Sequence, residues 1–176
     1  IAAIRGGTRA RLLILTVGIA IGIGDGIISK TLKTAVGRLR PHEVRTDVVT
    51  RALPKAKPAM LAMFRLPVVK NGEPAKASSR GNSFPSSHTI NMFSVATACL
   101  MILGHRAWWM AVVATLVAWS RVYCGSHWPS DLAASIPLGI LCGWIAVRIT
   151  GFLWQRYGKR FFPTAYAKMP ALTKRL

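Results

Sequence analysis

Acidic residues are scarce in this chain of 176 residues. Asp and Glu together number 5, against 24 Lys and Arg, which leaves a formal net charge of +19 at pH 7. A hydrolase that holds two metal ions needs clustered carboxylates, so five dispersed acids disfavour a metal site, and we expect no metal and no other cofactor. The excess of positive charge indicates an anionic partner, such as lipid headgroups, a phosphorylated substrate or nucleic acid.

Charged residues of either sign make up only 16% of the chain, whereas 52% of its residues are hydrophobic. This composition is too apolar for an ordinary soluble domain and excludes intrinsic disorder. The three cysteines are an odd number, and Cys99 and Cys142 lie inside apolar runs. Buried thiols are therefore expected rather than a disulfide framework, in a membrane protein that has lipid rather than nucleic acid as its anionic partner.

Apolar stretches give the expected architecture, a single all-α domain over residues 1–176 that forms a polytopic membrane helical bundle. Each stretch is at or below the roughly 17 to 25 residues of a usual membrane span, but each has flanks that can extend it by a turn. Flanking cations and tryptophans are typical of membrane interfaces. The expected spans are residues 12–29, 89–104, 107–124 and 132–147.

The remaining segments are expected to lie at the membrane surface. Residues 41–85 form a Pro-rich interfacial loop, in which the apolar run 59–69 suits a short helix in the headgroup layer or a lid on the bundle. Residues 148–176 form a basic tail. In the first span, Gly18, Gly22 and Gly26 share a face that permits close helix packing. Asp25 lies among these glycines. Two roles are open for it: an acid that takes part in function, or the structural partner of a Lys or Arg from another helix.

Two patterns of polar residues adjoin the first two spans. Lys33 and Arg40, seven residues apart, share a helical face after the first span and could grip one anion, although a headgroup contact is the commoner role of such a cluster. Ser86, Ser87 and His88 precede the second span. This pattern indicates a helix start whose free N–H groups bind anions. The alternative is a plain N-cap beside a surface histidine.

A third pattern lies between the last two spans, where Arg121 is followed by His127 and Asp131. The last two are four residues apart at a helix start, so the carboxylate can bond one imidazole nitrogen and leave the other free to attack. A structural histidine beside Trp128 is the competing interpretation. If the helices cross the membrane in succession, all three patterns meet at one face, and together they describe a metal-free phosphoryl-transfer site.

In order and spacing these residues resemble the three-part signature of the type 2 phosphatidic acid phosphatase (PAP2) superfamily. Its members include membrane lipid phosphatases, glucose-6-phosphatase and vanadium-dependent haloperoxidases. Ser87 stands where the signature has Gly, and its backbone N–H could still donate to phosphate. The matching positions are Lys33, Arg40, Pro41, Pro85, Ser86, His88, Ser120, Arg121, His127 and Asp131.

The resemblance implies a specific mechanism and a helix count. His127 attacks phosphorus and forms a phosphohistidine, Asp131 orients His127, and His88 protonates the leaving oxygen and then activates water. Family members typically have six membrane helices, so about four to six are expected, one or two of them upstream of Ile1 or hidden in the loop. The residues implied to hold the phosphoryl oxygens are Lys33, Arg40, Ser86, Ser87 and Arg121.

The leading hypothesis is a membrane lipid phosphatase, with alternatives from two other classes. Vanadate-dependent peroxidases use the same cations but are soluble, and a non-catalytic basic membrane protein that binds anionic lipids would release no phosphate. The substrate candidates are polyprenyl diphosphate, which we favour, phosphatidylglycerophosphate, phosphatidic acid and lipid A. The brevity of the chain favours a bacterial envelope lipid, and the basic flanks predict that the site faces outward, so we expect a bacterial inner membrane protein. The sequence does not indicate an oligomeric state.

Overall fold

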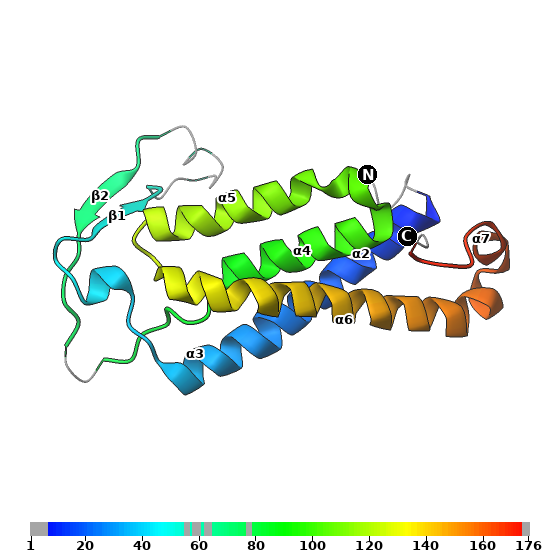
Figure 1. Ribbon diagram of the computed structural model, residues 1–176, viewed down its shortest axis with the longest axis horizontal. Helices are drawn as coiled ribbons and strands as arrows, with labels where there is room; N and C mark the ends of the chain where they lie inside the picture. Colours follow the sequence, from blue (N-terminus) through cyan, green and yellow to red (C-terminus); the bar gives the residue numbers. More distant parts are fainter. Residues whose placement is uncertain (1–6, 55–56, 58–60, 62–64, 77–78, 174–176) are drawn as a thin grey trace.

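The computed structural model describes residues 7–54, 57, 61, 65–76 and 79–173. Long helices lie side by side and form the body of the molecule (Figure 1). The first rod runs without interruption through α2 (Thr8–Ile21), the π-helix η1 (Gly22–Ser29) and α3 (Lys30–Val36). The later helices are α4 (Ser87–Leu103), the 3-10 turn η4 (His105–Ala107), α5 (Trp109–Tyr123), α6 (Pro129–Phe161) and α7 (Pro163–Lys168).

Local signals define the helix ends that matter for function. Gly37 ends α3 with a φ of 60°, a left-handed conformation that glycine adopts without strain. The hydroxyl of Ser86 caps α4 by accepting from the backbone N–H of Thr89. Pro129 occupies the first turn of α6, where its missing N–H costs nothing, and the Asp131 carboxylate caps the backbone N–H of Trp128.

These helix ends gather at one end of the bundle. Figure 1 shows the end of α3, the start of α4, the end of α5 and the start of α6 at the same end of the molecule. The η4 turn between α4 and α5 lies at the opposite end. Successive helices therefore alternate in direction, and this arrangement brings the three polar patterns to one end of the bundle.

Two of the described helical segments, Thr8–Glu43 and Pro129–Phe161, are long and apolar enough to cross a membrane. The helix α4 is apolar but shorter, with 17 residues, and α5 has 15. At 1.5 Å per residue these two span about 26 and 22 Å, less than the ~30 Å of a hydrocarbon core. Large apolar side chains of α5, including Val112, Leu116 and Trp119, are nevertheless exposed, as lipid-facing residues are.

Glycines allow α4 and α6 to approach each other closely. A Cβ at Gly139 would lie 2.7 Å from the carbonyl oxygen of Ile90, and one at Gly143 would lie 2.5 Å from that of Ser94. The stripe of Gly18, Gly22 and Gly26 expected from the sequence makes no such contact, because a Cβ at any of them would meet no described atom within 4 Å. These three glycines lie on an exposed face of the first rod, whereas Gly24, within η1, approaches Ile90.

The loop between α3 and α4 corrects the all-α expectation. It contains η2 (Pro41–Glu43) and a two-stranded antiparallel sheet of β1 (Val49–Ala52) and β2 (Val68–Asn71), with Val49 opposite Asn71. Residues 59, 60 and 62–64 of the expected interfacial helix 59–69 lie outside the described residues, but its end, Val68 and Val69, is β-strand. These β-branched side chains favour the extended conformation. The chain is therefore mostly helical, with a small hairpin.

The basic tail begins as part of the last helix rather than as a separate segment. The expected span 132–147 lies within α6, which continues to Phe161, with no proline between Val147 and Pro163. After this point α7 folds back. The ring of Trp154 is buried, packs against Tyr166 and donates its Nε1–H to the carbonyl oxygen of Met169 at 2.9 Å.

Candidate active site

The structure brings the histidines and cations of the three patterns together. His88 is exposed in the first turn of α4. It lies close enough to Lys33, Arg40 and Arg121 to interact with them electrostatically. His127, in the turn between α5 and α6, likewise interacts electrostatically with Lys33 and Arg40. Two imidazoles and a set of cations from four segments thus share one small region, which is suited to binding an anion.

His127 is held by the backbone of its own turn. Its N–H donates to the carbonyl oxygen of Arg121 at 3.3 Å, and the N–H of Ser126 donates to the same oxygen at 3.0 Å. Gly125 makes the turn possible with a φ of 65°. The ring is 6% exposed. The backbone therefore fixes a largely buried imidazole beside the end of α5.

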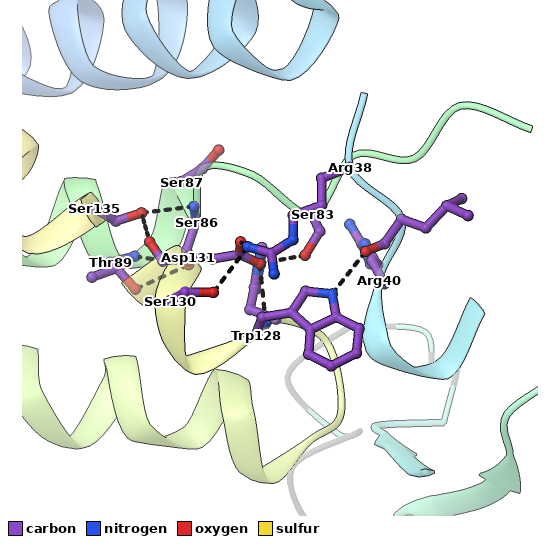
Figure 2. A network of polar contacts seen from close by, with 12 residues as sticks. Arg38, Arg40, Ser83, Ser86, Ser87, Thr89, Trp128, Ser130, Asp131 and Ser135 are labelled. Atoms are coloured by element: carbon purple, nitrogen blue, oxygen red, sulfur yellow. Dashed lines mark hydrogen bonds and ion pairs between the residues drawn. The ribbon is translucent and has the colours of Figure 1, made fainter. Parts of the chain in front are cut away.

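Asp131 lies at the centre of a hydrogen-bond network and is fully buried (Figure 2). Its Oδ2 accepts from the hydroxyl of Ser83 at 2.5 Å and from the N–H of Trp128 at 3.0 Å, and its Oδ1 accepts from Arg38 at 2.6 Å. His127 Nδ1 lies 3.7 Å from Oδ2, beyond hydrogen-bond range, and has no other partner among the described atoms. The pair is adjacent, as expected, but not bonded in this state.

The surroundings of His127 favour its neutral form. Burial lowers the pKa of His127 below its ordinary value, and the charges of Arg40 and Lys33 lower it further, whereas Asp131 and a backbone contact with Ser83 act in the opposite direction. A neutral imidazole has an unprotonated nitrogen. Because Nδ1 faces the carboxylate, Nε2 is the nitrogen that remains to react.

The start of α4 places the two serines differently. Ser86 is fully buried, its hydroxyl accepts from Thr89, and its N–H donates to Ser135 Oγ at 2.9 Å. The hydroxyl of Ser87 points away from this contact (Figure 2) and accepts from Lys33 Nζ at 2.7 Å. Lys33 is thus aimed at the N-terminal end of α4, where free backbone N–H groups also attract anions.

Sequence reasoning missed two members of the network around Asp131. Arg38 lies between Lys33 and Arg40 in the sequence and belongs to the same basic cluster, but its spacing did not indicate that it binds a carboxylate. Ser83 carried no signal of its own, since a lone serine before a helix start has many possible roles. Asp25 is exposed within η1 and lies near enough to His88 to act on it electrostatically.

Comparison with known proteins identifies the family. The family model described as the PAP2 superfamily matches residues 11–155, most of the chain and all three patterns. The chain belongs to the PAP2 superfamily. This membership confirms the resemblance derived from the motifs.

Curated PAP2 relatives and a solved structure are also similar. Lipid A 4'-phosphatase of Bacteroides thetaiotaomicron is 26% identical over 136 residues, which are 75% of this chain and 51% of that protein. Undecaprenyl-diphosphatase BcrC of Bacillus subtilis (strain 168) is 30% identical over 71 residues, 40% of this chain and 37% of that protein. This chain therefore spans about half, or less, of the length of each relative.

The crystal structure of Aquifex aeolicus LpxE matches with a TM-score of 0.53 and 24% identity, over 84% of this chain and 72% of that one. At this identity the match establishes the fold. The helix arrangement of this PAP2 chain therefore has a counterpart in a solved structure.

Proposed function

We propose that this chain is an integral membrane lipid phosphatase that hydrolyses a terminal phosphate through a phosphohistidine. The observation that carries the proposal is the buried His127, with Nδ1 facing Asp131 and with Lys33 and Arg40 within electrostatic reach. A nucleophile, a group to orient it and cations for phosphate oxygens are the parts that phosphoryl transfer needs.

In the first step, Nε2 of His127 forms a bond to phosphorus as the bond to the lipid oxygen breaks. Lys33, Arg40 and Arg121 stabilise the charge on the phosphoryl oxygens, and His88 gives its proton to the leaving oxygen. The imidazole of His127 becomes cationic as the bond forms. Rotation of the ring by a small angle would let its Nδ1–H donate to Asp131, which lies 3.7 Å away.

In the second step, water attacks phosphorus and the bond to His127 breaks. His88, now neutral, takes the proton from that water, so inorganic phosphate leaves and both histidines return to their starting states. The N–H groups at the start of α4, including that of Ser87, would hold the phosphoryl group in both steps. The Ser86 hydroxyl oxygen accepts from Thr89 at the helix cap, and its own proton stays available, so we propose that Ser86 donates to a phosphoryl oxygen.

The proposed substrate carries its phosphate on an apolar anchor within the membrane. The relatives named undecaprenyl-diphosphatase and lipid A 4'-phosphatase support this class. Polyprenyl diphosphate remains the substrate we favour. The scarcity of carboxylates, 5 in 176 residues, supports hydrolysis without a metal ion.

One activity panel tests the function and the metal requirement together. The purified protein in detergent is given polyprenyl diphosphate, phosphatidylglycerophosphate, phosphatidic acid and lipid A, each with excess EDTA, and released phosphate is measured. We expect release from at least one lipid, inhibited by vanadate, which mimics phosphate at the same cations. Activity lost in EDTA and restored by Mg²⁺ contradicts the metal-free site, and no release from any lipid favours a non-catalytic lipid-binding protein.

We further propose that the protein lies in a bacterial inner membrane with its site facing outward. The basic segments that flank the first and last spans, Arg9 to Arg11 and Arg148 to Arg160, support this orientation because cytoplasmic flanks carry excess Lys and Arg. Cysteine introduced at His105, in the η4 turn, should resist an impermeant reagent applied from outside. Labelling of that turn from outside reverses the assignment.

A further inference from the structure

The carboxylate of Asp131 already has a cationic partner that is not His127. The guanidinium of Arg38 donates through one nitrogen to Asp131 Oδ1 at 2.6 Å and to Ser130 Oγ at 2.9 Å (Figure 2). Asp131 is fully buried, whereas the side chain of Arg38 is 38% exposed. A buried carboxylate without a cationic partner is costly, so the ion pair with Arg38 offsets part of the cost of burying Asp131.

Arg38 is itself held in place by two other segments of the chain. Its guanidinium lies over the ring of Trp128 at 5.4 Å, and its carbonyl oxygen accepts from the N–H of Ser83 at 2.9 Å. The indole N–H of Trp128 donates to the carbonyl oxygen of Leu39 at 2.9 Å. The segment after α3, the segment before α4 and the start of α6 are thus linked around one carboxylate.

The position of Arg38 has an electrostatic consequence for His127. The charged groups that face this imidazole are Asp131 from α6, Lys33 from α3 and Arg40 from the segment after α3. Of these, only the carboxylate favours the imidazolium form, which cannot attack phosphorus. A guanidinium bound to the same carboxylate offsets part of its charge and also fixes its orientation.

We propose that Arg38 is a positioning residue that acts on His127 through Asp131. It holds the carboxylate in line with Nδ1 while offsetting its charge, so that His127 stays neutral until it attacks. During attack the ring becomes cationic, and the carboxylate is then in place to accept from Nδ1–H without having stabilised a proton on Nε2 beforehand. The inference rests on the proposed role of His127 as the nucleophile.

The test is the titration of His127 in Arg38→Gln, followed by NMR of histidine-labelled protein in detergent and assigned by comparison with His127→Ala. We expect the midpoint to rise by about one pH unit, because the carboxylate loses its competing cation. The acidic limb of the kcat/KM profile should move up in pH by the same amount. Arg38→Lys keeps the charge and should restore most of the profile.

Ser130→Ala is the matched control, because it removes the other partner of Arg38 and leaves the bond to Asp131 intact. Its titration should match that of the wild type. A double variant, Arg38→Gln with Asp131→Asn, tests the route of the effect. If Arg38 acts through Asp131, adding Arg38→Gln to Asp131→Asn changes the midpoint little. This comparison also remains available if Arg38→Gln alone leaves a buried carboxylate unpaired and does not fold.

Either of two results overturns the proposal: an unchanged His127 midpoint in folded Arg38→Gln, or an equal shift whether residue 131 is Asp or Asn. The NMR titration needs no turnover, which separates this inference from the proposed function. A raised midpoint in a chain that releases no phosphate would support the electrostatic role of Arg38 and contradict the phosphatase. Normal phosphate release, with the same His127 midpoint in Arg38→Gln as in the wild type, would support the phosphatase and contradict the electrostatic role of Arg38.

Discussion

His88→Ala and His127→Ala are expected to fail at different steps when the substrate is an aryl phosphate. A good leaving group needs little protonation, so His88→Ala should still transfer phosphate to His127 and show a burst of phenol. The phosphoenzyme should then accumulate, because no base activates water. His127→Ala has no nucleophile and should show neither a burst nor a phosphoenzyme.

Rapid-quench measurement of phenol and acid-labile phosphate distinguishes the two variants. With a lipid phosphate, whose leaving group is poor, the hydrolysis rate of His88→Ala should fall by about 10²- to 10⁴-fold. His105→Ala is the matched control, since its turn lies at the opposite end of the bundle (Figure 1), and it should keep wild-type kinetics. Phosphate trapped on His127→Ala, or undiminished lipid hydrolysis by His88→Ala, shows that these roles are exchanged or absent.

Asp131→Asn should slow formation of the phosphoenzyme by about 10² to 10⁴, by analogy with the carboxylate that orients a catalytic imidazole in serine proteases. The amide cannot stabilise the imidazolium that forms as His127 attacks. It also presents an N–H₂ group to donors such as Ser83 and Arg38, which now bond the carboxylate. The loss should therefore appear in kcat and kcat/KM together.

Asp47→Asn provides the control for this substitution. Asp47 pairs with Arg45 on the surface, at 2.7 Å, and both side chains are largely exposed, so its loss should leave the kinetics unchanged. Single-turnover rates and an unfolding curve in detergent separate chemistry from stability. An Asp131→Asn protein with a wild-type rate of phosphoenzyme formation contradicts the orienting role.

The sequence predicted the helix starts around the candidate site where the signals were local. Ser86 before an apolar run predicted the start of α4, and Pro129 with Asp131 predicted the start of α6, because capping depends on residues within one turn. The grouping of these ends at one face followed from the alternation of spans and short connections. The gathering of Lys33, His88 and His127 required no knowledge of side-chain contacts.

Contacts between distant segments could not be predicted in the same way. The bond from Arg38 to Asp131 depends on the left-handed turn at Gly37, which directs the chain across the start of α6. The bond from Lys33 to Ser87 depends on the relative positions of α3 and α4. Neither geometry can be read from spacing along one segment.

Three further differences have identifiable physical causes. The glycine stripe at Gly18 and Gly22 suggested a packing face, but both glycines are exposed, and Gly24 instead approaches Ile90. The Pro-rich loop contains a hairpin, whose strands carry the β-branched residues Val49, Thr50, Val68 and Val69, which favour the extended conformation. The last helix continues beyond its apolar stretch to Phe161, because polar residues with good helix propensity follow and no proline occurs before Pro163.

Identification of the phosphorylated residue tests the central claim most directly. The wild-type protein is mixed with a ³²P-labelled lipid phosphate, quenched within the first turnover, digested and mapped for acid-labile, alkali-stable label. We predict that the label resides on His127 and that it decays as inorganic phosphate appears. Phosphate release without a labelled His127 intermediate, or label on another residue, contradicts the account.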